Sequence, residues 1–300
     1  MDIIDKGIMT QFDETMETLK EKVLQWDIRK EDIWICSYPK TGTNWLLELV
    51  WMLVNDLDYE KALSISMNKR CPFLECAAVT KYQIMNSKLT DHPLEFIDPQ
   101  KFIEMNKAPV SIKTHLPWTC LPSQIQNGTK KSKVLYMTRN PYDTLLSLHH
   151  YVTSYFNYRG TIGDSVRDFL SGEGICCYGS YWDHVISYWQ RRKLSNLLIV
   201  KYEDFHRDLP EMIRKVSTFL EKPITEKELI KLADHLSFEK MKTNPSLKVM
   251  DERYFQQKGA YFYRSGKVGS YKEELSKEQI ARLKNTTEEK FRCLVDFETV

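Results

Sequence analysis

The sequence predicts an α/β fold, with a central, mainly parallel β-sheet flanked by helices. Short apolar runs that are typical of buried strands alternate with longer segments of helical periodicity, and polar residues follow each apolar run. The chain has 300 residues, of which 42% are hydrophobic, and this is enough for one large core. Because no repeat, low-complexity tract or linker divides residues 1–300, we expect a single domain.

The first predicted unit, at residues 32–54, is a strand, a tight loop and a helix. An apolar run at residues 33–36 leads into Ser37-Tyr38-Pro39-Lys40-Thr41-Gly42-Thr43-Asn44-Trp45, and further apolar residues follow at helical spacing. A helix N-terminus presents unpaired N–H groups and a positive partial charge, which attract an anion. Gly42 lets the backbone approach the anion closely, and Lys40 adds a full positive charge. Thr41 and Thr43 offer hydroxyls and a helix cap. In a Walker A loop the lysine follows the second glycine, whereas Lys40 precedes the glycine here, so the loop is P-loop-like only. An ordinary turn with a solvated lysine is the alternative.

The remaining elements follow from the same patterns. An amphipathic opening segment, with Met16 and Val23 on its apolar side, is expected to pack on the body of the protein. The irregular stretch at 56–106 is interpreted as substrate-facing loops, and residues 258–272 as a long loop. Further strands are expected at residues 109–114, 134–137 and 197–200, and further helices from residue 141 and at 210–220, 226–235 and 276–294.

Charge and cysteine usage limit the possible partners. The formal net charge is +2, from 43 basic and 41 acidic residues, which argues against a general nucleic-acid or membrane-surface binder. The seven cysteines include no C-x-x-C pair, so neither a disulfide framework nor a zinc site is indicated. No leader pattern and no apolar run of about 18 residues is present. We therefore expect a cytoplasmic protein that binds a small anion and no membrane.

Polar side chains that suit an anion follow four of the predicted strands. Lys40 follows the first, Lys113 and His115 come at the end of the second, Arg139 follows the third and Tyr202 the fourth. Ligands of open parallel sheets bind beyond the carboxyl ends of the strands. We therefore expect these residues to converge on one crevice.

These segments resemble the cytosolic sulfotransferases, which move a sulfuryl group from 3'-phosphoadenosine-5'-phosphosulfate (PAPS) to a hydroxyl or amine of a small acceptor. Residues 38–45 match the family's Y-P-K-[ST]-G-T-x-W loop, which binds the phosphosulfate, and residues 113–117 match K-T-H-L-P. Residues 139–147 resemble the segment that holds the 3' phosphate. Residues 202–204 and 237–245 resemble the family's segments that line the adenine. Residues 264–272 resemble the family's R-K-G-x-x-G-D-W-K loop near the C-terminus.

The resemblance implies a role for each matching residue. His115 would be the general base, Lys40 and Lys113 would stabilise the transferred group, and Ser147 would touch the loop lysine. Phe73, Tyr151 and Tyr178 align with aromatic residues that line the acceptor, which we expect to be phenolic, and no metal is expected. The residues implied to bind PAPS are Lys40, Thr41, Gly42, Thr43, Asn44, Trp45, Arg139, Ser147, Tyr202, Ser237, Phe238, Arg264, Ser265 and Gly266.

The sequence departs from the family pattern at several positions. Ser265 stands where the family has lysine, Leu236 where it often has threonine, and Ser270-Tyr271 where it has Asp-Trp. The family's dimer motif is poorly matched at residues 272–281, so a homodimer is possible but not indicated. Two alternatives stay open: a kinase that uses ATP and magnesium, and a nucleotide-binding module without turnover.

Overall fold

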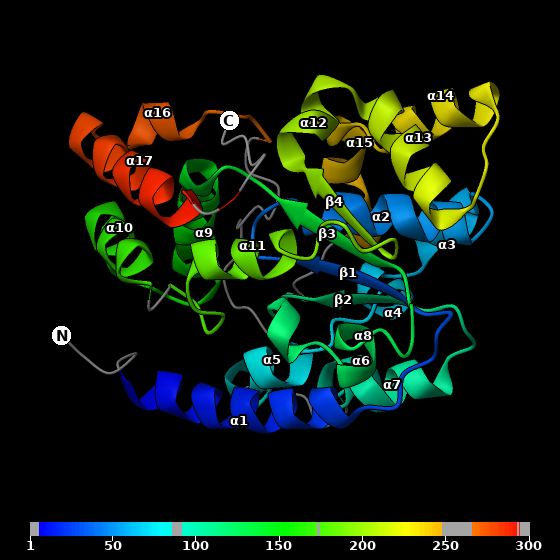
Figure 1. Ribbon diagram of the computed structural model, residues 1–300, viewed down its shortest axis with the longest axis horizontal. Coiled ribbons are helices and arrows are strands. Elements are labelled where there is room, and N and C mark those ends of the chain that lie inside the picture. The colour runs from blue at the N-terminus through cyan, green and yellow to red at the C-terminus, as the bar shows by residue number, and fades with distance from the viewer. Residues whose placement is uncertain (1–5, 86–91, 173–174, 248–265, 293, 295–300) are drawn as a thin grey trace.

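The sheet is the centre of the fold. The structure, a computed structural model, describes residues 6–85, 92–172, 175–247, 266–292 and 294, and these form one parallel four-stranded sheet with helices on both faces (Figure 1). The strand order is β2-β1-β3-β4, and the strands are β1 (Ile33–Ser37), β2 (Ser111–Thr114), β3 (Val134–Thr138) and β4 (Leu197–Lys201). Every strand pairing is parallel. The predicted fold class is confirmed.

Helices make up most of the remaining described structure. In chain order they are α1 (Lys6–Gln25), α2 (Thr43–Val54), α3 (Tyr59–Ser64), α4 (Met67–Arg70), α5 (Cys76–Met85), α6 (Leu94–Ile97), α7 (Pro99–Met105), η1 (Trp118–Cys120), α8 (Ser123–Gln126), α9 (Pro141–Tyr155), α10 (Ile162–Ser171), α11 (Tyr181–Trp189), α12 (Tyr202–Arg207), α13 (Leu209–Leu220), α14 (Glu226–His235), α15 (Phe238–Thr243), η2 (Pro245–Leu247), α16 (Tyr271–Glu274) and α17 (Lys277–Phe291).

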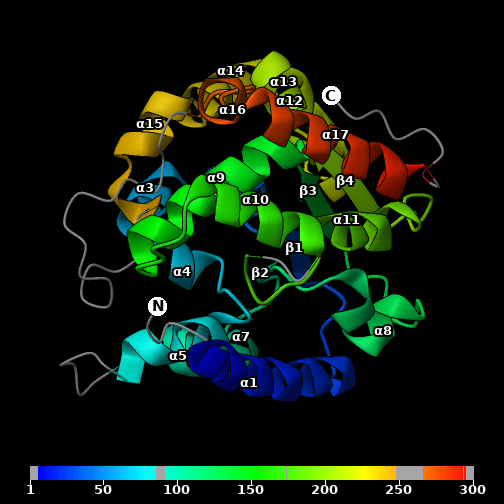
Figure 2. The same ribbon diagram turned by 90° about the vertical axis from the view of Figure 1, so that its left-hand side faces the viewer.

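The two faces of the sheet have separate hydrophobic cores. Side chains alternate along a strand, so Ile33 and Ile35 of β1 face one core while Trp34 and Cys36 face the other. The first core is completed by α2 and α12–α15, and the second by α1, α9–α11 and α17. Figure 2 shows α9, α10 and α17 lying side by side over the sheet. Cover on both faces explains why every residue of β1 and β3 is buried.

Several expected elements differ in the structure. The stretch at 56–106, predicted to be irregular, contains the helices α3 to α7, which have four to ten residues each and are too short to show a clear period. The strand expected at 109–114 begins at Ser111. The helices α10 and α11 were not predicted, although Thr161 forms a capping box at the start of α10. In the loop expected at 258–272, residues 258–265 lie outside the described residues, and α16 begins at Tyr271.

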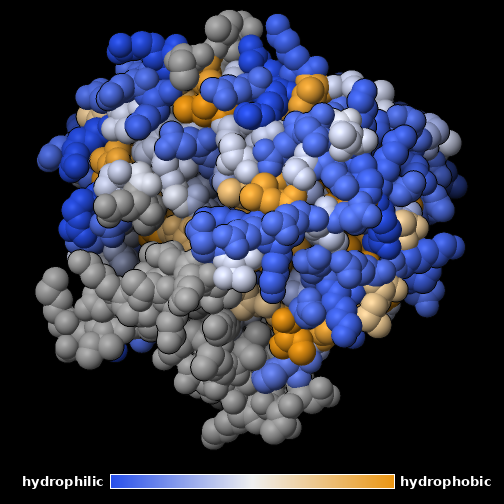
Figure 3. Space-filling view, turned by 60° about the horizontal axis from the view of Figure 1, so that its bottom comes forward, coloured by the Kyte–Doolittle hydropathy of each residue, from blue (hydrophilic) through white to orange (hydrophobic). Residues whose placement is uncertain are grey.

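The opening helix packs on the body as expected, because Met16 and Val23 of α1 are buried in the second core. The face of the molecule shown in Figure 3 is mostly hydrophilic, with hydrophobic residues in separate small areas. Of the helices in the described ranges, none has the length and apolar character needed to cross a membrane.

Candidate active site at the carboxyl edge of the sheet

The parallel register brings the polar strand-end residues to one edge of the sheet. Cys36 pairs with Thr114, so His115 lies beside Ser37, and Thr138 pairs with Lys201, so Arg139 lies beside Tyr202. The Arg139 guanidinium is 4.3 Å from the centroid of the Tyr202 ring, and its Nη1 donates to the Lys40 carbonyl oxygen at 3.3 Å. The structure therefore brings the predicted strand-end residues together.

The loop between β1 and α2 is built around Gly42. Gly42 has φ = 100° and is the N-cap of α2, so the first turn has no side-chain cap. A Cβ atom there would lie 2.4 Å from the Tyr202 ring. The prediction of a threonine cap is wrong, because Thr41 Oγ1 donates to the Tyr38 and Met137 carbonyls and Thr43 Oγ1 lies 2.6 Å from Ser37 Oγ. The threonine side chains thus fix the loop, and neither of them caps α2.

The His115 side chain is held in one tautomer. Its Nδ1 lies 2.8 Å from the Ser37 carbonyl oxygen, and a carbonyl can only accept, so Nδ1 carries the proton and Nε2 keeps its lone pair. Burial, followed by the charge of Lys113, holds the pKa of His115 well below its usual value of 6.5. At neutral pH, His115 is a neutral imidazole that can accept a proton at Nε2.

Two lysines lie close to this imidazole. Burial, followed by the charges of Lys113 and Arg139, lowers the pKa of Lys40 to about 7, and burial lowers that of Lys113 to about 8. Lys40 has φ = 69°, a left-handed conformation that is uncommon for lysine. Cations crowded together in this way favour an anion between them, because the anion would offset both the burial and the mutual repulsion.

Three aromatic residues surround the lysines and His115. The Phe73 and Tyr178 rings have their centroids 5.2 Å and 5.5 Å from that of His115, both edge to face. Lys113 Nζ lies 4.5 Å from the Phe73 centroid, and Lys40 Nζ lies 4.6 Å from that of Tyr151. A parallel bridge between Phe73 and Lys113 positions this ring. All three residues predicted to line the acceptor thus lie around Lys40, Lys113 and His115.

Other residues predicted to bind the nucleotide are linked to Arg139 through the Tyr202 side chain. The Tyr202 hydroxyl donates to the Gly266 carbonyl at 3.0 Å, and a Cβ at Gly266 would lie 2.4 Å from the Phe238 ring. Trp45 is buried with its ring 5.7 Å from that of Tyr202. Arg139 Nε is buried and has no hydrogen-bond partner in the described part of the chain, so it can serve an added acceptor.

The remaining predicted residues are placed as follows. Asn44 lies in the first turn of α2, half-buried Ser147 lies on α9, and Ser237 is the N-cap of α15. Arg264 and Ser265 lie outside the described residues.

Two residues that support the site were not predicted, one acting through its side chain and the other through its backbone. Glu75 Oε1 accepts from the His115 backbone N–H at 2.6 Å, and burial raises the pKa of Glu75 to about 7. Ser37 supplies the carbonyl that fixes the imidazole. The apolar neighbours of Glu75 in the sequence could have drawn attention to it, but no sequence signal indicates the role of the Ser37 carbonyl.

Comparison with known proteins identifies the family. The model of the sulfotransferase domain matches residues 30–294. The chain belongs to the sulfotransferase family. This sulfotransferase is 36% identical to luciferin sulfotransferase of Photinus pyralis over 89% of this chain and 74% of that protein. It is 32% identical to sulfotransferase 1E1 of Homo sapiens over 84% of this chain and 83% of that protein. The crystal structure of mouse sulfotransferase SULT7A1 complexed with PAP superposes with a TM-score of 0.67 at 26% identity, covering 93% of each chain.

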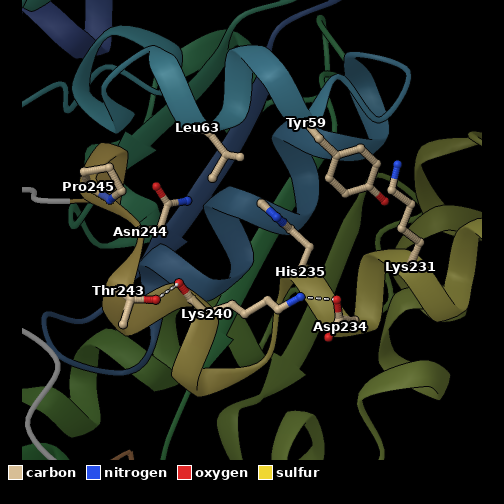
Figure 4. Close-up of a pocket in the computed structure, with 9 residues that line it drawn as sticks. All are labelled: Tyr59, Leu63, Lys231, Asp234, His235, Lys240, Thr243, Asn244 and Pro245. Carbon is tan, nitrogen blue, oxygen red and sulfur yellow. Dashed lines mark hydrogen bonds and ion pairs between the residues drawn. The ribbon is translucent and has the colours of Figure 1, made fainter.

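The sulfotransferase also has a pocket of about 360 Å³ between α3, α14 and α15, and none of the residues predicted for the site lines it (Figure 4). Its wall includes His235, whose Nε2 lies 2.7 Å from Glu48 Oε1 on α2. The other Glu48 oxygen forms a buried ion pair with Arg70 at 2.8 Å. This buried network ties the wall of the pocket to the helix that follows the Gly42 loop.

Proposed function

We propose that this protein transfers the sulfuryl group of PAPS to a hydroxyl or amine of a small acceptor, giving the sulfate and adenosine 3',5'-bisphosphate (PAP). The observation that carries the proposal is a neutral His115, fixed in one tautomer, beside the half-buried Lys40 and the buried Lys113. Membership of the sulfotransferase family and the PAP complex of the mouse relative support the same donor. We place this activity in the cytoplasm, as the sequence predicts.

The residues at the carboxyl edge fit a nucleotide with phosphates at both ends. The uncapped N-terminus of α2, with Lys40, Thr41, Gly42, Thr43 and Asn44, would hold the 5' phosphosulfate. The buried Nε of Arg139 has no partner in the described structure and would serve the 3' phosphate together with Ser147. The Trp45, Tyr202 and Phe238 rings would border the adenine. Bound there, PAPS supplies the sulfuryl group and a phosphate leaving group.

The chain's own residues provide the catalysis. His115 Nε2 would take the proton of the acceptor hydroxyl, while Lys40 and Lys113 place positive charge where the transferred group and the leaving oxygen become negative. Burial is the main cause of the low pKa of His115, and an anion beside the two lysines would offset the further lowering that their charges cause. Binding of the donor would thereby make His115 a stronger base at the stage where a proton must be taken.

The walls around His115 favour a flat, apolar acceptor. Phe73, Tyr151 and Tyr178 would line the acceptor, and the Tyr178 hydroxyl is buried with no hydrogen-bond partner within the described residues. A phenolic acceptor would pack its ring among these side chains and present one polar atom to Nε2. We therefore propose a phenol as the substrate class.

A transfer assay without added metal tests the proposal. Radiolabelled PAPS would be offered with phenols, catecholamines, steroids and aliphatic alcohols, and we expect label to be transferred first of all to the phenols. Activity with ATP and magnesium instead would favour the kinase alternative. Tight PAP binding without transfer to any acceptor would favour the binding module without turnover.

The affinity for PAP is expected to fall as the pH rises above about 7. An anion binds the protonated form of Lys40, whose pKa is about 7 without ligand, so each pH unit above that value lowers the affinity by up to about tenfold. Lys113, with a pKa of about 8, adds to the fall at higher pH. Calorimetry from about pH 6.5 to about pH 9 would measure the trend. An affinity that is flat over this range would contradict the proposed contact between Lys40 and the nucleotide.

A further inference from the structure

We propose that Asp143 is a positioning residue that fixes residues 266–271, here called the late loop, against Arg139. The expected effect of Asp143 on nucleotide binding rests on the proposed function. Its expected effect on the position of the late loop does not. Asp143 is in the first turn of α9, its side chain is fully buried, and it is not among the residues predicted to bind substrate.

Both carboxylate oxygens of Asp143 are engaged by the late loop. Oδ2 accepts from the Gly269 N–H at 2.7 Å, and Oδ1 accepts from the Tyr271 N–H and the Ser270 hydroxyl, both at 3.1 Å. Oδ2 also accepts from the Asn140 side-chain amide at 2.9 Å. Four donors meet one buried group that can only accept, and an ionised carboxylate satisfies all of them. Ser270 stands where the family pattern has aspartate.

The late loop is connected to the candidate site as well as to Asp143. Arg139 Nη2 donates to the Lys267 carbonyl at 3.2 Å and lies 3.9 Å from Asp143 Oδ2. The Tyr202 hydroxyl donates to the Gly266 carbonyl at 3.0 Å. Asp143 therefore sets the position of the loop backbone that contacts Arg139, and it attracts the guanidinium electrostatically. Both effects orient Arg139 for the 3' phosphate.

Other contacts join the same two parts of the chain. The Tyr142 and Tyr271 rings stack with centroids 4.7 Å apart, and His150 Nε2 lies 2.7 Å from Glu274 Oε2. Because these contacts hold α16 on α9 without Asp143, a variant at Asp143 should keep the fold and loosen the late loop locally.

Amide hydrogen exchange of nucleotide-free Asp143→Asn tests the inference. Asparagine turns one oxygen into a donor that faces the loop N–H groups, so we expect the Gly269 and Tyr271 amides to exchange at least about tenfold faster. PAP affinity should weaken by about ten- to a hundredfold, because the loop and Arg139 are no longer held. At saturating PAPS the turnover should change far less than the KM for PAPS.

Glu203→Gln is the matched control. Glu203 is also buried and accepts from the Asn140 N–H at 2.8 Å, but among the described residues its hydrogen bonds go to Asn140 and not to the late loop. The Glu203→Gln variant should leave the amide exchange rates of Gly269 and Tyr271 unchanged. Unchanged exchange in a folded Asp143→Asn protein would overturn the inference, and faster exchange with unaltered PAP affinity would overturn the link to the nucleotide.

Ser270→Ala provides a second test if Asp143→Asn fails to fold. It removes a single donor to Oδ1, so exchange at Tyr271 should rise about threefold, and an unchanged rate would refute the role of Asp143. A wild-type protein that does not bind PAP would refute the proposed function, while the exchange results would still decide the role of Asp143 in the loop.

Discussion

His115→Ala is expected to lower turnover by at least about a hundredfold while leaving PAP affinity within about threefold. The Ser37 carbonyl holds the proton on Nδ1, so Nε2 is the atom that would accept the acceptor's proton, and alanine removes it. PAP should still bind, because Lys40, Arg139 and the N-terminus of α2, and not the imidazole, would hold the nucleotide. Steady-state kinetics with a phenol acceptor and calorimetry with PAP would measure the two effects separately.

His149→Ala is the control for that experiment. His149 is half-buried on α9, and its Nδ1 lies 2.8 Å from Ser165 Oγ on α10. Removing this imidazole should change turnover by less than about threefold, because its contact is structural. If His115→Ala kept full turnover, the proton would have to leave by another route and His115 would lose its role as base.

The meeting of the strand-end residues at one edge could be predicted from sequence because the sheet is parallel. Lys40, His115, Arg139 and Tyr202 each follow a buried apolar strand, and parallel strands place their carboxyl ends at one edge. This prediction requires only the positions of the strands, and the short apolar runs of buried strands are easily recognised in a sequence. The amphipathic face of α1 and the capping box at Ser276 were predicted for similar reasons, since both depend on local patterns.

The parts that could not be predicted depend on contacts between distant residues. The Glu75 carboxylate reaches His115 across 40 positions, and Asp143 reaches Gly269 across 126. No local pattern encodes such pairs. The threonines of the first loop show the same limit, because their hydroxyls can either cap the helix or bond to nearby carbonyls. In the folded chain β3 packs beside the loop, and the Thr41 hydroxyl bonds to the Met137 carbonyl instead of capping the helix.

Lys40→Met is expected to lower turnover by about a hundred- to a thousandfold, which is the usual cost of removing one group that stabilises developing negative charge. Methionine keeps a similar length and is no more strained than lysine at φ = 69°, so the loop should stay intact. PAP affinity should fall much less than turnover, because Arg139 and the N-terminus of α2 still hold the nucleotide. The fall in affinity that begins at about pH 7 should disappear, since the group with that pKa is gone.

Lys133→Met is the control that separates the loss of the Lys40 charge at the candidate site from the loss of a positive charge elsewhere on the protein. Lys133 precedes β3, at the opposite edge of the sheet, and pairs with Glu221 at 2.8 Å on the surface. It should change turnover by less than about twofold, because exposed pairs contribute little. If the loss of turnover in Lys40→Met were fully explained by weaker PAPS binding, so that saturating PAPS restored it, Lys40 would act in binding alone. A loss of turnover at saturating PAPS, with PAP affinity largely kept, would instead place its charge in the transition state.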